Sequence, residues 1–467
     1  MKLKFKTKPW KHQKKALKYL MPRNFGALYT DMGSGKTKVF IDLTINKGFG
    51  VTLIVTTKKI CERHTWETEF SKHSFSNEIS VLSAWYMPYD KRPSMVKEKL
   101  TELKNKRQAA IIMNYDSVWR EPFRSYLLKN PPDCIICDES HRIKSPGSKV
   151  SKFLYLMGKK VKNRYILTGT PSAESPLDVY AQYRFLEPSI FGTNFANFKA
   201  EYTNQILIPG GFTILDKKNP YKNLDKFREL MFSCAFMEEI DQDLPPVQDI
   251  VVEFDMSQKA QKYYKEMRKE GCLELKNGVV EANNVLAILT RLQQINSGYL
   301  PVVNDDGEVT ITEIDNSRQE AFKELLEGIP ENEPVVVFAK YKKDIKDARK
   351  IAKELGRKSS ELSGSRDTMQ RWVDGNTTVL VIQISSGAEG LNELVRAKYC
   401  IYYSLHHSLV LWRQSRKRLS RPGQTRPVIY YTLVAKMKQG VTVDEKILKS
   451  LENKQSYVDI VMNTREL

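Results

Sequence analysis

The sequence predicts an α/β protein with two halves, each built on a parallel β-sheet covered by helices. Three observations lead to this fold class. Short apolar runs alternate with longer helical patterns, the runs are continuously apolar, and the rhythm pauses near residue 241 before it resumes. Continuously apolar strands are typical of parallel sheets that are buried on both faces. The length of 467 residues also exceeds one ordinary core and fits two domains.

Five apolar runs in the first half are predicted to be strands, with a helix directly after the first of them. Residues 172–235 then break the rhythm with a mostly helical, aromatic-rich segment and a hairpin at 205–218 around a Pro-Gly-Gly turn. We expect this stretch to form a protrusion on the first half, with insertions of helix and hairpin. The predicted strands are FGALYT (25–30), VTLIVTT (51–57), AAIIMNY (109–115), DCIICDE (133–139) and NRYILTGT (163–170).

DQDLPPVQDI (241–250) is the predicted linker, because it is acidic and contains two prolines. The predicted domains are therefore residues 1–240 and 241–467. A helical insertion is expected at about 257–315, and the α/β rhythm then resumes. The strands predicted after it are EPVVVFAK (333–340), TTVLVIQIS (377–385), AKYCIYYSL (397–405) and RPVIYYTLV (426–434).

The composition points to a polyanionic partner. The formal net charge is +20, and a surplus of this size favours nucleic acid over a merely solvated lysine-rich surface. Charge alone does not separate DNA from RNA or from a membrane surface. Six scattered cysteines fit a reducing compartment. No apolar run is long enough to span a membrane and the basic N-terminus lacks a signal-peptide core, so we expect a cytoplasmic protein without a membrane partner.

TDMGSGKTK (30–38) directly follows a predicted strand and opens a predicted helix. Glycines there allow a tight turn whose backbone N–H groups face phosphate oxygens, while Lys36 can reach the β and γ phosphates and the Thr37 hydroxyl can bind Mg²⁺. The strict phosphate-loop pattern is not met, since Thr30 occupies its first glycine position. The alternative is a chance G-x-G-K-T turn, which the strand-loop-helix context disfavours. The predicted nucleotide-binding residues here are Gly33, Ser34, Gly35, Lys36 and Thr37.

CDESH (137–141) places two carboxylates at the end of another strand. Strand ends of a parallel sheet share one edge, so Asp138 can lie beside the loop that holds Lys36. Asp138 suits a Mg²⁺ ligand, and Glu139 suits a base that orients the attacking water. His141 is expected to contact the γ-phosphate side or a neighbouring motif. The alternative is a solvated acidic turn.

LWRQSRKRLSRPGQTRP (411–427) lies in a run, from 396 to 427, that contains no Asp or Glu. Gln414, Arg418 and Arg421 fall at i, i+4 and i+7, which predicts one helical face. Guanidinium groups on that face can clamp the γ-phosphate as charge develops during transfer. The alternatives are a solvated basic helix or a nucleic-acid patch. Because these residues are in the second half, we expect the nucleotide to bind between the halves.

Together the motifs resemble superfamily 2 helicases and translocases, most closely the Swi/Snf-like group, and in compactness a phage-type branch-migration helicase. The resemblance covers nearly the whole chain and implies two RecA-like lobes, ATP with Mg²⁺, and movement along one strand of DNA. It rests on nine motifs in order, among them PWKHQKKAL, TDMGSGKT, LIVTTKKICERHTWETEF, DESH, LTGTP, VVVFAKY, VIQISSGAEGLN and QSRKRLSRPGQ.

The resemblance also implies roles for individual residues. Gln13 would contact adenine, and Gly390 and Gln414 would line the nucleotide pocket. Thr168 and Thr170, with His141, would couple hydrolysis to strand movement. The residues implied to contact DNA are Lys58, Asn114, Tyr115, Lys340, Ser386 and Gly387.

The resemblance to compact family members leads to one hypothesis about the substrate. Such members remodel forks, displaced loops and four-way junctions, and an aromatic protrusion at 180–218 could act as a wedge. We therefore expect a monomeric motor for branched DNA that works with replication or recombination proteins, in the bacterial host cytoplasm if it is phage-encoded. The alternatives are a duplex translocase without strand separation, an RNA helicase, and a nucleic-acid-binding scaffold that does not hydrolyse ATP.

Overall fold

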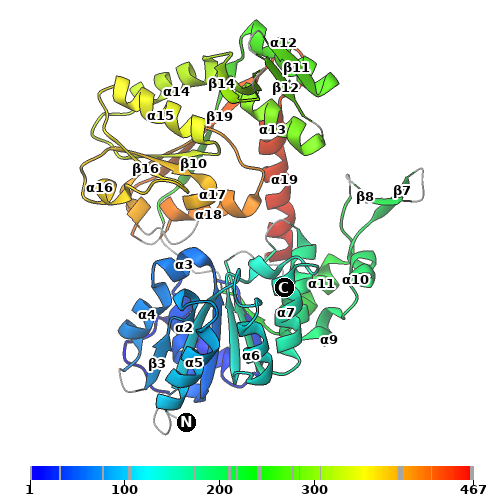
Figure 1. Cartoon of the computed structure of the whole chain (residues 1–467), viewed down its shortest axis with the longest axis vertical. Helices are drawn as coiled ribbons and strands as arrows, with labels where there is room; N and C mark the ends of the chain where they lie inside the picture. Colours follow the sequence, from blue (N-terminus) through cyan, green and yellow to red (C-terminus); the bar gives the residue numbers. More distant parts are fainter. Residues whose placement is uncertain are drawn as a thin grey trace. The chain divides into compact units, whose positions relative to one another are not determined.

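The chain folds into two compact units in the computed structural model, residues 1–241 with 456–467 and residues 242–455 (Figure 1). Below, they are called unit 1 and unit 2. The structure describes residues 3–462 except for 31–32, 76–77, 104–107, 170, 173–174, 209–211, 217–218, 239–243, 276–277, 283, 305–306, 388–392 and 422.

Unit 1 is built on a seven-stranded sheet in the order β3-β4-β2-β5-β6-β1-β9, and every neighbouring pair in it is parallel. The five strands predicted for this half are confirmed. Two short edge strands, β3 and β9, were not predicted. The strands are β1 (Phe25–Leu28), β2 (Val51–Thr56), β3 (Ile79–Leu82), β4 (Gln108–Asn114), β5 (Cys134–Asp138), β6 (Asn163–Leu167) and β9 (Ala235–Phe236).

The continuous apolar runs reflect two cores, one on each face of this sheet. Ile54 and Ile136 belong to the core that also contains Phe40 of α2, whereas the adjacent Leu53 and Ile135 belong to the opposite core. Successive side chains of a strand point to opposite faces, so a sheet covered on both sides needs apolar residues at every position. The helices of this unit are α1 (Lys11–Leu20), α2 (Lys36–Lys47), α3 (Lys58–Glu62), α4 (Thr65–His73), η1 (Ala84–Tyr86), α5 (Arg92–Glu102), α6 (Phe123–Lys129), η2 (Ser140–Ile143) and α7 (Lys149–Gly158).

The predicted protrusion is largely part of the core of unit 1. Tyr180 and Tyr183 of α8 are fully buried, and Phe198 and Phe227 pack into the same cluster. These aromatic residues therefore cannot form an exposed wedge, because their side chains are buried in the core of unit 1. Only the antiparallel pair β7–β8 extends away from α10 and α11 (Figure 1). The elements are η3 (Pro176–Asp178), α8 (Val179–Leu186), α9 (Pro188–Phe191), α10 (Phe195–Tyr202), β7 (Gln205–Ile208), β8 (Phe212–Leu215) and α11 (Leu224–Phe232).

Unit 2 contains a six-stranded parallel sheet in the order β10-β19-β18-β15-β17-β16. The four predicted strands are confirmed, and with unit 1 they confirm the predicted α/β fold of two parallel-sheet lobes. The strands are β10 (Val247–Asp255), β15 (Val335–Ala339), β16 (Ser359–Leu362), β17 (Val379–Gln383), β18 (Tyr399–Tyr402) and β19 (Val428–Lys436).

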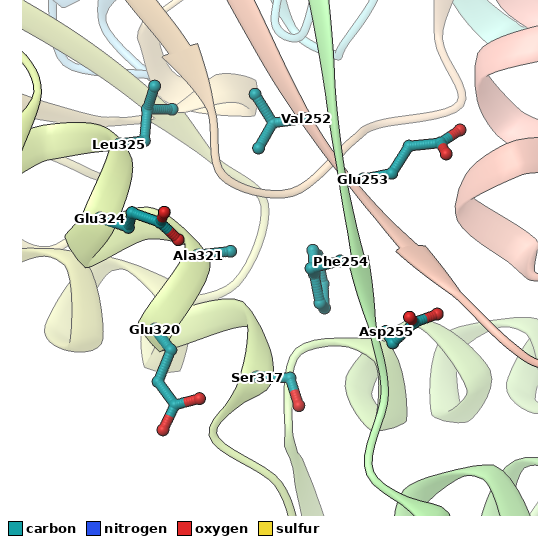
Figure 2. Close-up of a pocket in the computed structure, with 9 residues that line it drawn as sticks. All are labelled: Val252, Glu253, Phe254, Asp255, Ser317, Glu320, Ala321, Glu324 and Leu325. Atoms are coloured by element: carbon teal, nitrogen blue, oxygen red, sulfur yellow. The ribbon is translucent and has the colours of Figure 1, made fainter.

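The predicted linker was partly wrong. Its last four residues, 247–250, begin strand β10 at the edge of the sheet, while 241–243 lie outside the described residues. An edge strand tolerates the polar residues that led to the linker prediction, and Asp249 there pairs with Arg416 at 2.5 Å. A pocket of about 540 Å³ lies between β10 and α14 (Ser317–Glu327). Figure 2 shows Phe254 of β10 facing Ala321 of this helix.

The predicted helical insertion at about 257–315 also contains a sheet. Two helices accompany four antiparallel strands in the order β11-β12-β13-β14. The insertion packs around an apolar core that includes Tyr264, Ile295 and Leu300 and that it shares with Ala435 of β19. Its elements are α12 (Gln258–Glu270), β11 (Cys272–Leu275), β12 (Gly278–Glu281), α13 (Val285–Asn296), β13 (Tyr299–Val303) and β14 (Val309–Glu313).

The remaining helices follow the strands of the large sheet in alternation, as a parallel sheet requires. Within the described part of the chain, we find no helix with the length and apolar character to cross a bilayer. These helices are α14 (Ser317–Glu327), α15 (Lys342–Glu354), α16 (Met369–Val373), α17 (Ile384–Gly387), η4 (Glu393–Arg396), α18 (Leu409–Leu419) and α19 (Val443–Met462).

Candidate active site

Three neighbouring strands of unit 1 carry the predicted nucleotide motifs at one edge of the sheet. β6 lies between β5 and β1, and all three are parallel. The glycine-rich loop follows β1, Asp138 ends β5, and Thr168 follows β6. Chain segments that are more than a hundred residues apart in sequence therefore meet at the carboxyl ends of adjacent strands, where ligands of open α/β sheets bind.

The glycine-rich loop turns through two residues with positive φ, Gly33 at 81° and Gly35 at 72°. Gly35 is also the residue before α2, so the loop leads directly to a helix N-terminus. The Lys36 ammonium donates to the Thr30 carbonyl at 2.9 Å. Thr30, the departure from the strict motif, has its hydroxyl 2.8 Å from that of Ser34. This hydroxyl pair closes the loop where the strict motif has glycine, and the following backbone is suited to an anion.

Gln13 lies against the loop. Its Nε2 donates to the carbonyls of Ser34 and Gly35, each at 3.3 Å, and its Oε1 accepts from the Trp10 backbone N–H at 2.8 Å. A Cβ added at Gly35 would lie 2.3 Å from this Nε2, so Gly35 is required for the close contact. Both ends of the Gln13 amide are thus bonded within the protein and the side chain is buried. It holds the glycine-rich loop through these bonds, and its contact with adenine stays a prediction.

Asp138 is held by residues from two other segments. The Thr56 hydroxyl and the Trp66 indole N–H both donate to Oδ2, at 3.0 and 2.9 Å, and all three side chains are buried. Burial and the neighbouring Glu139 carboxylate raise the pKa of Asp138 to about 6, against the lowering effect of these hydrogen bonds and of Lys36. Lys36 belongs to the loop that follows β1, and β1 is separated from β5 and Asp138 by β6 alone.

The residues predicted for water activation and coupling form one cluster. Glu139 has a φ of 51°, which turns its side chain at the end of β5. Its Oε2 accepts from the Thr168 hydroxyl at 3.2 Å and lies 3.3 Å from Nδ1 of His141. The same Nδ1 is 3.3 Å from the Thr168 hydroxyl. The structure therefore brings Glu139, His141 and Thr168 together, whereas Thr170 lies outside the described residues.

The three nucleic-acid contacts predicted for unit 1 differ in accessibility. Lys58 begins α3 and its side chain is 64% exposed. Asn114 is buried, and its Oδ1 accepts from the backbone N–H and hydroxyl of Ser117. Tyr115 is only 3% exposed, and its hydroxyl donates to the Asp138 carbonyl at 2.7 Å. Tyr115 is thus a core residue that supports the end of β5, and it has almost no exposed surface with which to contact DNA.

The basic stretch of unit 2 follows the helical prediction only in part. Gln414 and Arg418 are buried residues of α18, but that helix ends at Leu419 and Arg421 lies beyond it. The prediction of one helical face through Arg421 was therefore wrong. The residue before a proline is disfavoured in the α conformation, and Pro422 follows. Burial lowers the pKa of the Arg421 guanidinium, while the Glu393 carboxylate opposes the shift.

The other predicted residues of unit 2 follow strands β15 and β17. Lys340 comes directly after β15 and contacts the Gln293 Oε1, and burial lowers its pKa. Ser386 and Gly387 end α17, just after β17, and the Ser386 hydroxyl donates to Gln383 at 3.3 Å. Gly390 lies outside the described residues.

The donor set of unit 1 fits a magnesium-bound triphosphate. Backbone amides at a helix N-terminus and the Lys36 ammonium suit phosphate oxygens. Hard oxygen ligands suit Mg²⁺, and the Thr37 hydroxyl and Asp138 carboxylate supply such oxygens. Both described hydrogen bonds to the Asp138 carboxylate engage Oδ2, so neither occupies Oδ1. Two residues that sequence reasoning missed, Thr56 and Trp66, fix the orientation of this carboxylate.

Several known proteins resemble the chain over most of its length. A protein of Acyrthosiphon pisum secondary endosymbiont phage 1, described only as putative protein p41, is 25% identical over 98% of both chains. An uncharacterized ATP-dependent helicase of Mycoplasma genitalium is 23% identical over 96% of this chain and 42% of its own length. A DNA repair and recombination protein of Saccharomyces cerevisiae is 24% identical over 86% of this chain and 45% of its own. The chain thus spans less than half of these two larger relatives.

One solved structure, the Sulfolobus solfataricus SWI2/SNF2 ATPase core in complex with dsDNA, is 21% identical with a TM-score of 0.44, over 99% of this chain and 96% of that one. Residues 12–298, more than half of the chain, match the family described as SNF2-related domain. The match begins at the helix that carries Gln13 and includes every predicted motif residue of unit 1. The predicted resemblance to the Swi/Snf-like group is confirmed, and the chain belongs to the SNF2-related domain family.

Proposed function

We propose that the protein is a DNA-dependent ATPase that moves along DNA and remodels branched DNA. One observation carries the ATPase proposal. The glycine-rich loop, Asp138 and the Glu139–His141–Thr168 cluster lie at the carboxyl ends of three adjacent parallel strands. In this proposal Lys36 binds the β and γ phosphates, and Asp138 with Thr37 holds Mg²⁺, which would stabilise charge on the phosphate oxygens.

Glu139 accepts a proton from the attacking water in this proposal, and its neighbours link that step to movement. Its carboxylate accepts from Thr168, the first residue after β6. A change in the charge or position of Glu139 therefore acts directly on the motif of the next strand. Arg418 and Arg421 of unit 2 stabilise the charge that develops on the γ-phosphate.

The nucleic acid is proposed to be DNA, with phosphates bound at exposed or partly exposed groups after the strands. Lys58 of unit 1 is exposed, and Lys340 and Ser386 follow strands of unit 2. Phosphate contacts supply affinity without sequence information. The relative named a DNA repair and recombination protein supports DNA over RNA. Replication or recombination proteins are the proposed partners, and the active species is a monomer.

The β7–β8 hairpin supports the proposal of branched substrates. Three of its apolar side chains, Ile206, Leu207 and Ile214, are exposed by 48%, 70% and 43%. A two-stranded hairpin with exposed apolar residues is unusual on a surface without a binding role. Apolar side chains can insert between base steps and unstack them. We propose that the hairpin, rather than the buried aromatic residues, acts as the wedge at the branch point of a fork.

The test compares ATP hydrolysis and unwinding on single-stranded, duplex and forked DNA and on RNA. We expect stimulation by DNA but not RNA, and faster unwinding of forks than of linear duplexes. Ile206→Ser/Leu207→Ser should reduce the fork-to-linear ratio at least about threefold. Val309→Ser/Ile311→Ser, which alters exposed apolar residues of β14, is the matched control. No stimulation by any DNA would refute the ATPase proposal, and equal unwinding of forks and linear duplexes by the unaltered chain would refute the branch proposal.

A further inference from the structure

Unit 2 contains a cationic groove that no predicted motif uses. It is an open groove of about 670 Å³ between the end of α15, the start of β16 and α16. Seven of its nine lining residues are lysine or arginine, and none is acidic. The exposed ones come from three separate segments: Lys346, Lys350 and Lys353 from α15, Lys358 from the turn before β16, and Arg371 from α16.

The groove lies at the amino-terminal ends of the strands, and the predicted motifs lie at the carboxyl ends. Ser359, the first residue of β16, pairs in parallel with Val379, the first residue of β17. Lys340 and Ser386 instead follow the carboxyl ends of β15 and β17. A five-residue strand separates the two edges by about 16 Å. The groove is therefore a different surface from the one that carries Lys340 and Ser386.

The positive charge in the groove is poorly compensated. Lys346, Lys353 and Lys358 form no ion pair with any described carboxylate, and Lys350 has only Glu354 at 3.8 Å, an exposed pair. Like charges at i, i+3 and i+4 destabilise a helix, and Lys346, Lys350 and Lys353 have this spacing on α15. A cation near a helix C-terminus is favourable by itself, which accounts for Lys353 but not for Lys358 or Arg371 from other segments.

Two arginines form the fixed wall of the groove. Arg357 is 5% exposed and donates to the carbonyls of Leu326, Ile329 and Glu333. Its Nε has no partner among the described residues. Arg349 donates to Glu361 at 2.6 Å. These bonds hold the end of α14 and the start of β16 together, so that the exposed lysines project from a rigid base.

We propose that this groove binds the phosphate backbone of a second nucleic-acid segment, such as another arm of a branched DNA. Lys346 and Lys353 lie on one helix face about 10 Å apart, so their ammonium groups can contact different phosphates of one strand. The groove opens at the amino-terminal ends of the strands and Lys340 and Ser386 follow the carboxyl ends, which favours a different DNA arm from the one that these two residues contact. This inference rests on the proposed action on DNA, and it gives that action a second point of attachment.

The test uses the full chain with Lys346→Ala/Lys350→Ala/Lys353→Ala. The matched control is Lys259→Ala/Lys262→Ala/Lys265→Ala, three exposed lysines of α12 in the same unit. Affinity for a four-way junction and for a short linear duplex is measured across a salt series. Each lost phosphate contact lowers the slope of log affinity against log salt by about 0.9. We expect the groove variant to lose about 2–3 units of slope on the junction and, with affinity at 1 M salt unchanged, to bind it roughly 100- to 1,000-fold more weakly at 0.1 M salt.

The linear duplex should lose less than the junction, and Lys346→Arg/Lys350→Arg/Lys353→Arg should restore junction affinity, which a folding defect would not allow. Thermal unfolding of each variant confirms that it is folded. Junction binding by the groove variant equal to that of the control would refute DNA binding by the groove. If the unaltered chain still shows DNA-stimulated ATP hydrolysis, the proposed function is not affected by that result. Absence of that stimulation in the unaltered chain refutes the proposed function itself. Binding of phosphatidylserine vesicles, but not of junctions, through the same lysines would replace DNA by a membrane and overturn the inference.

Discussion

Thr56→Val should remove one of the two hydrogen bonds that orient the Asp138 carboxylate while leaving the shape of the site unchanged. Thr56 is fully buried in β2, and its hydroxyl donates to Asp138 Oδ2 at 3.0 Å. Valine has nearly the same shape but no donor, so the substitution removes one hydrogen bond and leaves no cavity. A hydrogen bond to a charged group contributes about 1.5–3 kcal/mol. The variant therefore tests whether this bond orients the proposed magnesium ligand.

The expected size of the effect follows from that energy. If the bond keeps Asp138 in its metal-binding orientation, kcat/KM for ATP falls roughly 10- to 150-fold, at about 1.4 kcal/mol for each factor of ten. The Trp66 indole still donates to the same oxygen at 2.9 Å. We therefore expect a value near the lower end, together with a higher magnesium concentration for half-maximal hydrolysis.

Thr52→Val is the matched control, because it makes the same chemical change four residues earlier on the same strand. Thr52 is also fully buried, but its hydroxyl has no hydrogen-bond partner among the described residues. Removing an unpaired buried hydroxyl is neutral or stabilising. Steady-state hydrolysis over a magnesium series and urea unfolding compare the two variants. Equal kcat/KM for Thr56→Val and Thr52→Val would refute the role assigned to the Asp138 bond.

The remaining predictions concern charge in both units. Lys36→Ala should abolish ATP hydrolysis. DNA-stimulated hydrolysis above a few per cent of the rate of the unaltered chain would contradict the proposed binding of phosphate by Lys36. Glu139→Gln should bind a fluorescent ATP analogue normally but turn over at least about 100-fold more slowly, because an amide cannot accept the proton. Arg418→Ala and Arg421→Ala should each lower kcat more than they raise the nucleotide Kd, and unchanged kcat in both would assign the basic stretch to DNA. Burial raises the pKa of Asp344 from its ordinary 3.8 to about 6. The stability that this carboxyl contributes is therefore complete below pH 3.8 and is lost as the pH rises through 6. In urea titrations, Asp344→Asn should add about 1–3 kcal/mol to the free energy of unfolding at pH 8 but little at pH 4.

The strands that the sequence predicted are those with the simplest physical cause. β5 and β15 are buried on both faces, so β15 is apolar at every position and β5 is apolar up to its last residue, Asp138. β10 was taken in part for a linker, because it is an edge strand with exposed polar residues that alternate with half-buried ones. β3 and β16 are four residues long and mixed in polarity. Periodicity carries little information for such strands, since tertiary pairing rather than burial defines them.

The candidate site divides in the same way between local and distant information. The loop with Lys36 and the pair Asp138 and Glu139 are recognisable because each motif lies within a few consecutive residues and follows an apolar strand. The groups that hold these residues could not be predicted from local pattern, since Trp66 is 72 residues from Asp138 in sequence and Thr56 is 82.

The buried tyrosine after β4 shows why residue type alone misleads. The family resemblance implies that Tyr115 contacts DNA, but this tyrosine is buried and donates to the backbone carbonyl of Asp138 at the end of β5. Such a residue affects the chemistry through geometry alone. Tyr115 and Trp66 contact the same aspartate from the core, one through its carbonyl and the other through its carboxylate. The position of the proposed magnesium ligand therefore depends on the packing of the unit 1 core, and core substitutions near β4 and α4 should alter hydrolysis before they unfold the protein.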